Sequence, residues 1–343
     1  MKQIYIHIGL HKTGSTYIQK VFTENRDILR ESGIDYPELG AEFLFGHHNI
    51  AWSLMPGRAL QNTNRFSTEQ LLKYFEESPF ERFLISSEDF DFLQSHQVEK
   101  LHRLLSNYQV EIVMYARNPV EAVYSRWQEG IKHGETKPLK DYCEQIAINP
   151  KPLDYCRTAS TWTNVFGADA VTIVIYDNLV AKKVDVALYF LRNILEIEAK
   201  EDRFLLPKAW VNPSNDAGVI EALRQLNEVQ KFSEQREKVM GSLITFLEQS
   251  VRGKALKQHL KNIYDESPEF IDIQPLKEVF NEISTKFLLI HKQQTKNTYN
   301  DRQLFVNKET SDRSTIRTVK PEAISKSIDI KKLYKLLQQE QLS

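Results

Sequence analysis

The hydrophobic pattern of the chain changes along its length. Four short segments are rich in isoleucine and valine, and polar residues follow each of them: QIYIHIG, RFLISSE, VEIVMYA and AVTIVIY, which begin at residues 3, 82, 110 and 170. Such segments are typical of strands buried in a parallel sheet. After the first segment, apolar residues recur at helical spacing as far as Ser32 and Gly33, and from about residue 215 onward the pattern is mostly helical. We therefore expect an α/β fold, a P-loop-like parallel β-sheet flanked by helices, with a mostly helical C-terminal part.

A change of composition near residue 308 suggests where the domain ends. The sequence turns polar there and then offers a lysine-rich amphipathic piece, IDIKKLYKLLQQ. We expect one domain over residues 1–308 and a loosely attached polar tail over residues 309–343. The amphipathic piece could instead form a short helix that docks a partner.

Composition excludes several broad classes of function. The 343 residues are 41% hydrophobic and 27% charged, with a net charge of −1, so we expect a globular fold with no general attraction to nucleic acid or an anionic membrane. No apolar run approaches the roughly 20 residues of a membrane span, and the polar N-terminus does not resemble a signal peptide. Cys143 and Cys156 lack metal-ligand neighbours, which favours inert thiols in a reducing compartment and predicts a cytoplasmic protein.

The first expected strand runs into a glycine loop, IHIGLHKTGST. Gly9 and Gly14 have the spacing of a P-loop, but Ser15 stands where the P-loop lysine belongs, and Lys12 precedes the second glycine. Backbone donors, a positive charge and hydroxyls meet in this loop, which indicates an anion site rather than a bare turn. The candidate binding residues are Lys12, Thr13, Gly14, Ser15 and Thr16. A lysine in this position does not suit a Ser/Thr–Mg²⁺ arrangement, so we expect an anion that reacts without a metal.

A second candidate anion site follows the third strand segment, in YARNPVEAVYSRWQEG. Arg117 ends the strand, and Ser125 lies two turns into the helix that Pro119 begins. An arginine fork and a hydroxyl can grip a second phosphate. Alternatively, the arginine pairs with Glu121 or Glu129 on a solvated face.

Together the two motifs resemble the sulfotransferase family that uses 3′-phosphoadenosine 5′-phosphosulfate (PAPS), in particular its bacterial branch whose loop begins HKTG. HKTGST is similar to the family's 5′-phosphosulfate loop, and ARNPVEAVYSRW to its 3′-phosphate motif. The resemblance covers residues 1 to about 308 and implies that Arg117 and Ser125 hold the 3′-phosphate. Tyr176 matches a family tyrosine near the adenine, although a core tyrosine is an equal alternative. Many members also have a glycine-rich, basic C-terminal segment, and VRGKALK shares only its charges.

The resemblance also implies an activity. The chain would move a sulfuryl group from PAPS to a hydroxyl or amine acceptor, with no metal ion, and Lys12 would neutralise the oxygen that bridges sulfur and phosphorus. Its partners would be PAPS and the acceptor. A glycan is one acceptor class, because aromatic rings that could stack on sugars occur in the sequence between the loop and the third strand segment. These are Tyr36, Phe43, Phe45, Trp52 and Phe90.

The acceptor needs a general base, and two candidates are open. Glu88 comes directly after FLISS, at the end of the second strand segment, and should point toward the ligand edge of the sheet. It could instead pair with Lys12 or cap the next helix. His47 and His48, in FGHHNIAW, are the rivals.

Two other function classes compete with this interpretation. A P-loop kinase using ATP and Mg²⁺ needs a lysine just after Gly14 and a strand-ending aspartate; Asp177 is available for the second role but also suits a helix N-cap. A non-catalytic nucleotide-binding or scaffold protein would need the loop but no base.

Overall fold

The computed structural model describes residues 1–41, 45–60, 67–198, 203–207, 216–229, 236–296 and 314–340. The chain divides into two compact units, and each is assembled from three separate stretches of sequence. The first unit comprises Met1–Asn118, Asp154–Asn212 and Glu282–Lys308. The second comprises Pro119–Leu153, Pro213–Asn281 and Glu309–Ser343.

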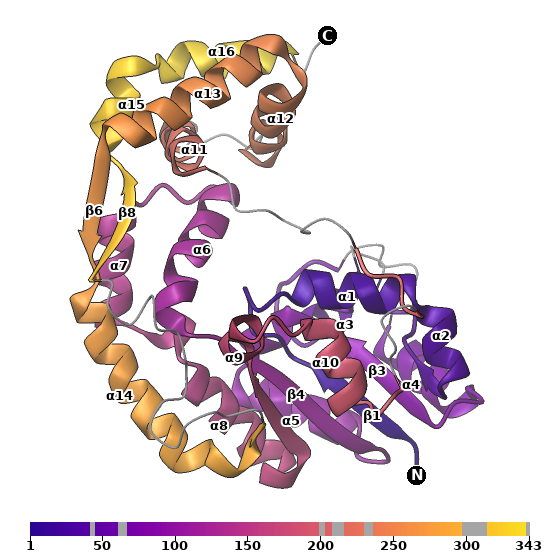
Figure 1. Cartoon of the computed structure of the whole chain (residues 1–343). Helices are drawn as coiled ribbons and strands as arrows, with labels where there is room; N and C mark the ends of the chain where they lie inside the picture. Colours follow the sequence, from indigo (N-terminus) through magenta and orange to yellow (C-terminus); the bar gives the residue numbers. More distant parts are fainter. Residues whose placement is uncertain are drawn as a thin grey trace. The chain divides into compact units, whose positions relative to one another are not determined.

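The first unit contains a six-stranded sheet in the order β2-β3-β1-β4-β5-β7, in which every pair of neighbouring strands is parallel (Figure 1). Its strands are β1 (Gln3–His7), β2 (Ile34–Asp35), β3 (Arg82–Ser86), β4 (Gln109–Ala116), β5 (Val171–Ile175) and β7 (Thr295–Lys296). Four of them, β1, β3, β4 and β5, coincide with the four segments that the hydrophobic pattern predicts, although β4 begins one residue earlier. The α/β fold with a parallel sheet is confirmed.

The strand order determines where ligands can bind. The chain makes β3 on one side of β1 and then crosses to make β4 on the other side. In open parallel sheets this change of direction opens the sheet at the carboxyl ends of the strands, which is where ligands bind. The segments that follow β1, β3, β4 and β5 all start from this edge.

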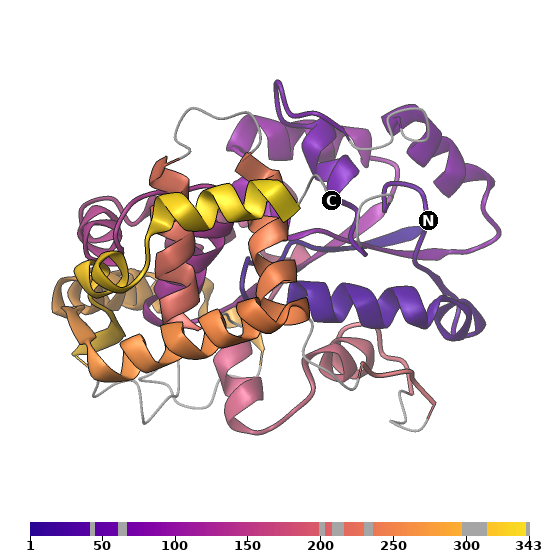
Figure 2. The same ribbon diagram turned by 90° about the horizontal axis from the view of Figure 1, so that it is seen from above.

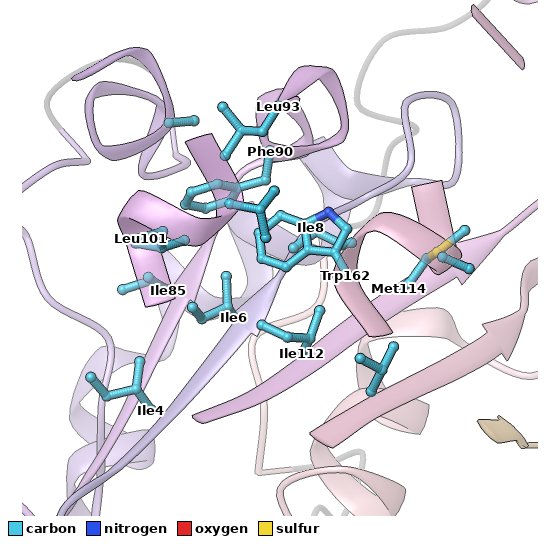
Figure 3. Packing of buried hydrophobic residues seen from close by; sticks show 14 of the residues in the cluster. Ile4, Ile6, Ile8, Ile85, Phe90, Leu93, Leu101, Ile112, Met114 and Trp162 are labelled. Atoms are coloured by element: carbon cyan, nitrogen blue, oxygen red, sulfur yellow. The ribbon is translucent and has the colours of Figure 1, made fainter. Parts of the chain in front are cut away.

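Helices cover both faces of the sheet. Alternate residues of β1 point to opposite faces, and both sets are buried in hydrophobic clusters. On one face Ile4, Ile6 and Ile8 pack with Leu101 and Trp162, as Figure 3 shows. On the other face Tyr5 belongs to a second cluster built with α1, which Figure 2 shows in indigo beside the sheet. The helices that lie in the described residues of this unit are α1 (Ser15–Glu24), α2 (Arg26–Glu31), α3 (His48–Ser53), α4 (Thr68–Glu77), α5 (Ser95–Leu104), α8 (Tyr155–Phe166), α9 (Tyr176–Ala181) and α10 (Val186–Asn193), with the 3₁₀ helices η2 (Glu88–Phe92), η4 (Ala168–Ala170) and η5 (Lys292–Gln294), apart from the part of α14 that is described with the second unit.

The helix expected between the glycine loop and Gly33 is interrupted. Asn25, with φ −119° and ψ 23°, separates α1 from α2. Its side chain donates to Val21 O at 2.7 Å and to Leu205 O at 3.0 Å, and it accepts from Leu205 N at 2.8 Å. Asparagine side chains that bond to backbone groups compete with the helical pattern, which explains the break.

The second unit is mostly helical, as the pattern predicts for the C-terminal part. It contains α6 (Pro119–Lys132), α7 (Leu139–Ile148), η3 (Lys151–Leu153), α11 (Ala217–Val229), α12 (Arg236–Gln249), α13 (Val251–Glu266), β6 (Pro268–Asp272), β8 (Thr315–Val319), α15 (Pro321–Ser327) and α16 (Ile330–Glu340). The helix α14 (Gln274–His291) begins in this unit, and its residues from Glu282 onward belong to the first.

Residues beyond 308, which the sequence analysis assigns to a tail, contribute three elements to the second unit. Strand β8 pairs antiparallel with β6, from Pro268 opposite Val319 to Asp272 opposite Thr315. Helix α16, yellow in Figure 2, lies across α11 and α12. The apolar side chains of this stretch that are buried include Val319, Ile324, Leu333 and Leu337. They are scattered among polar residues, so the composition of the stretch conceals its core.

Candidate functional site

The glycine loop leaves β1 at the ligand edge in a tightly specified conformation. Gly9 and Gly14 have φ values of +85° and +78°, and Lys12 has φ +67°. A non-glycine residue in this left-handed region costs on the order of 1–3 kcal/mol, so the surrounding contacts must impose it. Those contacts include Leu10 N to Tyr115 O at 3.0 Å and Thr13 Oγ1 to Leu10 O at 2.5 Å. The loop is therefore fastened to β4 and to itself.

The loop delivers the N-terminus of α1 to the same edge. Gly14 is the N-cap of α1, and because glycine has no side chain it cannot accept hydrogen bonds from the first-turn N–H groups. Unsatisfied N–H groups and the positive end of the helix dipole form an anion-binding arrangement. Of the predicted hydroxyls, Thr13 and Ser15 are buried, while Thr16 is partly exposed. The Thr13 hydroxyl bonds within the loop and so shapes it.

Arg117 and Tyr176 both reach the glycine loop. The Arg117 guanidinium donates from Nη1 to Lys12 O at 2.8 Å, and its Cζ lies 5.6 Å from the centre of the Tyr176 ring. A Cβ placed on Gly14 would lie 3.6 Å from Tyr176 Cε2, so the ring lies beside the second glycine of the loop. Burial raises the pKa of Tyr176 despite the opposing charge of Arg117, which keeps the phenol protonated.

One donor of this group lacks an internal acceptor. Arg117 Nε is buried and has no hydrogen-bond partner among the described residues. Buried polar groups are normally paired, and an exception at the ligand edge is a candidate for a bond to a bound group. The guanidinium therefore has a donor to offer an anion beside the loop.

Ser125, predicted as the partner of Arg117, lies on α6 in the second unit and is partly exposed. Arg117 belongs to the first unit. The shared grip of these two residues on a phosphate thus stays a prediction.

Asp177, the residue that a kinase would use for its metal, has a backbone partner. It lies in the first turn of α9 and is buried, and its Oδ2 accepts from Asn118 N at 2.7 Å. This contact ties the start of α9 to the residue after Arg117 and so helps to hold Arg117 in place.

Glu88 begins η2 directly after β3 and packs on the glycine loop. A Cβ on Gly9 would lie 2.9 Å from Glu88 Cβ and 3.0 Å from Glu88 Cα, so this close approach requires glycine. The partly exposed carboxylate accepts from Gln19 Nε2 at 2.7 Å. The structure thus brings Glu88, Lys12, Arg117 and Tyr176 to one loop.

His47 and His48 differ in their surroundings. His47 is fully buried; its Nε2 donates to Pro37 O at 3.0 Å and its Nδ1 accepts from Ser86 N at 3.1 Å. Burial lowers the pKa of His47 to about 3, so this ring is a neutral tie between backbone segments. His48 Nδ1 lies 2.9 Å from Ser87 Oγ and 3.1 Å from Asp89 Oδ2. Ser87 and Asp89 are the two neighbours of Glu88 in sequence.

Sequence reasoning missed an acidic pair in η2 that holds the loop. His11 Nδ1 lies 2.9 Å from Asp91 Oδ2, and His11 Nε2 lies 3.3 Å from Asp89 Oδ1. The indole of Trp52 also donates to Asp89 Oδ2, at 2.7 Å. Burial acts to raise the pKa of Asp89, but hydrogen bonds from His11 and His48 outweigh it, and this pKa lies below its usual range. The signal was available, since histidine and aspartate follow neighbouring strands.

Most of the aromatic residues proposed for sugar stacking are core residues. Tyr36 and Phe90 are fully buried, Trp52 is nearly so, and Phe45 is partly buried; Phe43 lies outside the described residues. An aromatic ring that the sequence analysis did not select, Phe92, is 44% exposed, and its centre lies 4.6 Å from that of His11.

Across the described ranges, no group of three or more His, Cys, Asp or Glu side chains is arranged to hold a metal ion, and no helix combines the length and hydrophobicity of a membrane span.

The sequence matches no protein-family model and no curated protein. Among solved structures, the chain is similar to the crystal structure of a sulfotransferase from Alicyclobacillus acidocaldarius, with 13% sequence identity and a TM-score of 0.42 over 70% of this chain and 96% of that one. The functional assignment therefore depends on the residues of the site.

Proposed function

We propose that this chain is a sulfotransferase that moves a sulfuryl group from PAPS to a hydroxyl or amine acceptor. The observation that carries the proposal is the convergence of Lys12, Glu88, Arg117 and Tyr176, from the ends of four strands, on one glycine loop. An anion-binding loop, a cation, a guanidinium, an aromatic ring and a carboxylate are the groups that such a donor and its reaction need.

The donor set fits an adenosine phosphosulfate. In our proposal the loop N–H groups and the N-terminus of α1 receive the phosphosulfate, as helix N-termini receive phosphates. Arg117, which has a buried donor without a partner in the described part of the chain, receives the 3′-phosphate together with Ser125. The Tyr176 ring packs near the adenine.

The reaction then needs one base and one positive charge. The acceptor oxygen or nitrogen attacks sulfur while the bond between sulfur and the bridging oxygen breaks, and that electron pair leaves with 3′,5′-adenosine bisphosphate. Glu88 takes the proton of the acceptor. The Lys12 ammonium neutralises the charge that grows on the bridging oxygen, a role that a metal ion fills in kinases.

A carbohydrate hydroxyl is the acceptor class to test first. The exposed Phe92 ring, close to His11 beside the loop, offers an apolar face of the kind on which sugars stack.

The test is calorimetric binding of 3′,5′-adenosine bisphosphate and of ATP, each with and without Mg²⁺. We expect bisphosphate binding that does not depend on Mg²⁺ and is tighter than ATP binding. Tighter binding of ATP that requires Mg²⁺ would support the kinase alternative instead.

Lys12→Ala tests the chemistry. Removing a charge that stabilises a transition state costs about 10²- to 10³-fold in rate, and we expect a loss of this size in transfer from ³⁵S-labelled PAPS. The matched control is Lys20→Ala in α1, where Lys20 pairs with Glu24 at 3.6 Å. This variant should leave transfer nearly unchanged. Transfer by Lys12→Ala within a few-fold of wild type would exclude the role.

A further inference from the structure

The side-chain amide of Gln19, a buried residue, donates a hydrogen bond to the carboxylate of Glu88, the proposed general base. Gln19 lies in the second turn of α1 with only 1% of its surface exposed, and its Nε2 donates to Glu88 Oε2 at 2.7 Å. Long side chains lose considerable rotamer freedom when they are buried. Because the buried Gln19 side chain has little freedom, its hydrogen bond restricts the orientation of the partly exposed Glu88 carboxylate.

The Gln19 amide also packs against the backbone of a glycine, Gly46. A Cβ on Gly46 would lie 2.8 Å from both Gln19 Cδ and Gln19 Oε1, and also 2.8 Å from His48 Nε2. The backbone at Gly46 thus packs directly against the amide. Because the stem of Glu88 packs on Gly9, both ends of the Gln19–Glu88 contact rest on glycine backbone.

The position of Gln19 links the two proposed chemical groups. Helix α1 has the glycine loop with Lys12 at its N-terminus, and it carries Gln19 one turn further along. One rigid element therefore sets the place of the positive charge and the orientation of the base. In proton transfer a misplacement of about 1 Å can cost on the order of 10²-fold in rate.

We propose that Gln19 is a positioning residue for the reaction: its amide fixes the Glu88 carboxylate in the orientation that receives the acceptor proton. This inference rests on the proposed function, in which Glu88 is the base. In this proposal Gln19 acts through Glu88, to which its amide donates, and not through a contact with the donor.

The test compares Gln19→Leu, Gln19→Glu, Glu88→Gln and the double variant Gln19→Leu/Glu88→Gln. Turnover of ³⁵S-labelled PAPS is measured with chitotetraose, glucosamine or water as the acceptor, using whichever is fastest. A hydrogen bond to a charged group corresponds to roughly 10- to 100-fold, so we expect kcat to fall by this factor in Gln19→Leu. The KM for PAPS and the Kd of 3′,5′-adenosine bisphosphate should stay within about threefold.

Two features separate positioning from a merely structural role. In the Glu88→Gln background, Gln19→Leu should cause no further loss, because coupled residues are not additive. The matched control is Gln97→Leu, which also removes a buried amide hydrogen bond, from Gln97 Nε2 to Leu54 O at 3.0 Å. It should lower the melting temperature and leave kcat near that of wild type.

Gln19→Glu keeps the shape of the side chain if the leucine variant fails to fold. It replaces the donor by a second carboxylate, so its kcat should be low at neutral pH. The kcat should recover as acidification adds a single proton to the two carboxylates, which restores a hydrogen-bond donor to Glu88 while Glu88 stays ionised.

Each contrary result has its own meaning. A kcat of Gln19→Leu within twofold of wild type, or an equal loss with and without Glu88, overturns the positioning role and leaves the sulfotransferase proposal standing. Full turnover by Glu88→Gln overturns Glu88 as the base and this inference with it. Failure of the wild-type protein to bind the bisphosphate or to turn over PAPS overturns the proposed function itself.

Discussion

At the scale of single residues, burial decides which histidines can take part in chemistry. His7 and His47 are both fully buried, and burial lowers each pKa to about 3. His7 Nδ1 lies 2.8 Å from Ser86 Oγ, and His47 bonds to backbone on both sides. Both rings are therefore neutral structural groups. Because protonation of either ring is unfavourable in the folded state, acidification should lower the stability of the fold.

This predicts a pH-dependent stability. Between about pH 6.5 and pH 3 the unfolded state binds a proton at each histidine that the folded state excludes, so stability is complete above pH 6.5 and falls as the pH is lowered. The slope can reach about 1.4 kcal/mol per pH unit for each histidine. Urea unfolding at pH 7, 6, 5 and 4 measures it.

His47→Gln should lower stability at pH 7, since backbone bonds are lost, and should flatten the slope. As a control, His96→Gln changes an exposed histidine and should leave the slope as it is. A free energy of unfolding that is the same at pH 7 and pH 4 would contradict the prediction.

Part of the candidate site could be predicted from the sequence, because charged residues that follow neighbouring parallel strands must lie at one edge of the sheet. Lys12, Glu88 and Arg117 follow β1, β3 and β4 in this way. The burial of His47 could not be predicted, since its partners Pro37 and Ser86 depend on how a loop packs on β3. Gln19 gave no signal for a related reason: on a helical pattern it is one polar residue among several.

At the scale of elements, the approach of η2 to the glycine loop requires a glycine at residue 9. Gly9→Ala would strain a φ of +85° and would also place its Cβ 2.9 Å from Glu88 Cβ. We expect the variant to be less stable, and to lose transfer activity because Glu88 moves away from the loop.

The matched control is Gly33→Ala. Gly33 has a φ of +77°, but no atom of the residues that the structure describes lies within 4 Å of an added Cβ. This variant should therefore show only the left-handed strain of about 1–2 kcal/mol. Denaturant unfolding and PAPS turnover of the two variants make the comparison. Equal losses of stability with unchanged turnover in both would mean that the contact with Glu88 does not matter.

Strands and helices could be predicted where a short local sequence pattern determines the secondary structure. The strands β1, β3, β4 and β5 were found from four segments of seven residues that are rich in isoleucine and valine. The break at Asn25 was not, because it depends on Leu205, which lies 180 residues away in sequence. Local patterns cannot contain such a partner.

At the scale of the whole molecule, the role of the C-terminal stretch can be tested by truncation. Ending the chain after residue 308 removes β8, the partner of β6, and α16, which covers α11 and α12. We expect the second unit to lose its cooperative unfolding and to become sensitive to protease, because a strand edge and apolar helix surface are uncovered.

A chain ended after residue 340 keeps all of these elements and should behave like wild type. If the chain that ends after residue 308 melts and resists protease as wild type does, the stretch is the loosely attached tail that its composition predicts.

The interleaving of the two units has a consequence for synthesis on the ribosome. Strand β1 emerges first, yet its neighbours β3 and β4 comprise residues 82–86 and 109–116, and the edge strand β7 waits until residues 295–296. Most of the second unit is translated before that last strand. Neither unit can therefore complete its fold before most of the other has been translated. The nascent chain carries an incomplete parallel sheet for most of its translation. Unpaired strand edges of this kind are prone to aggregation, so we expect chaperones to protect the chain at this stage.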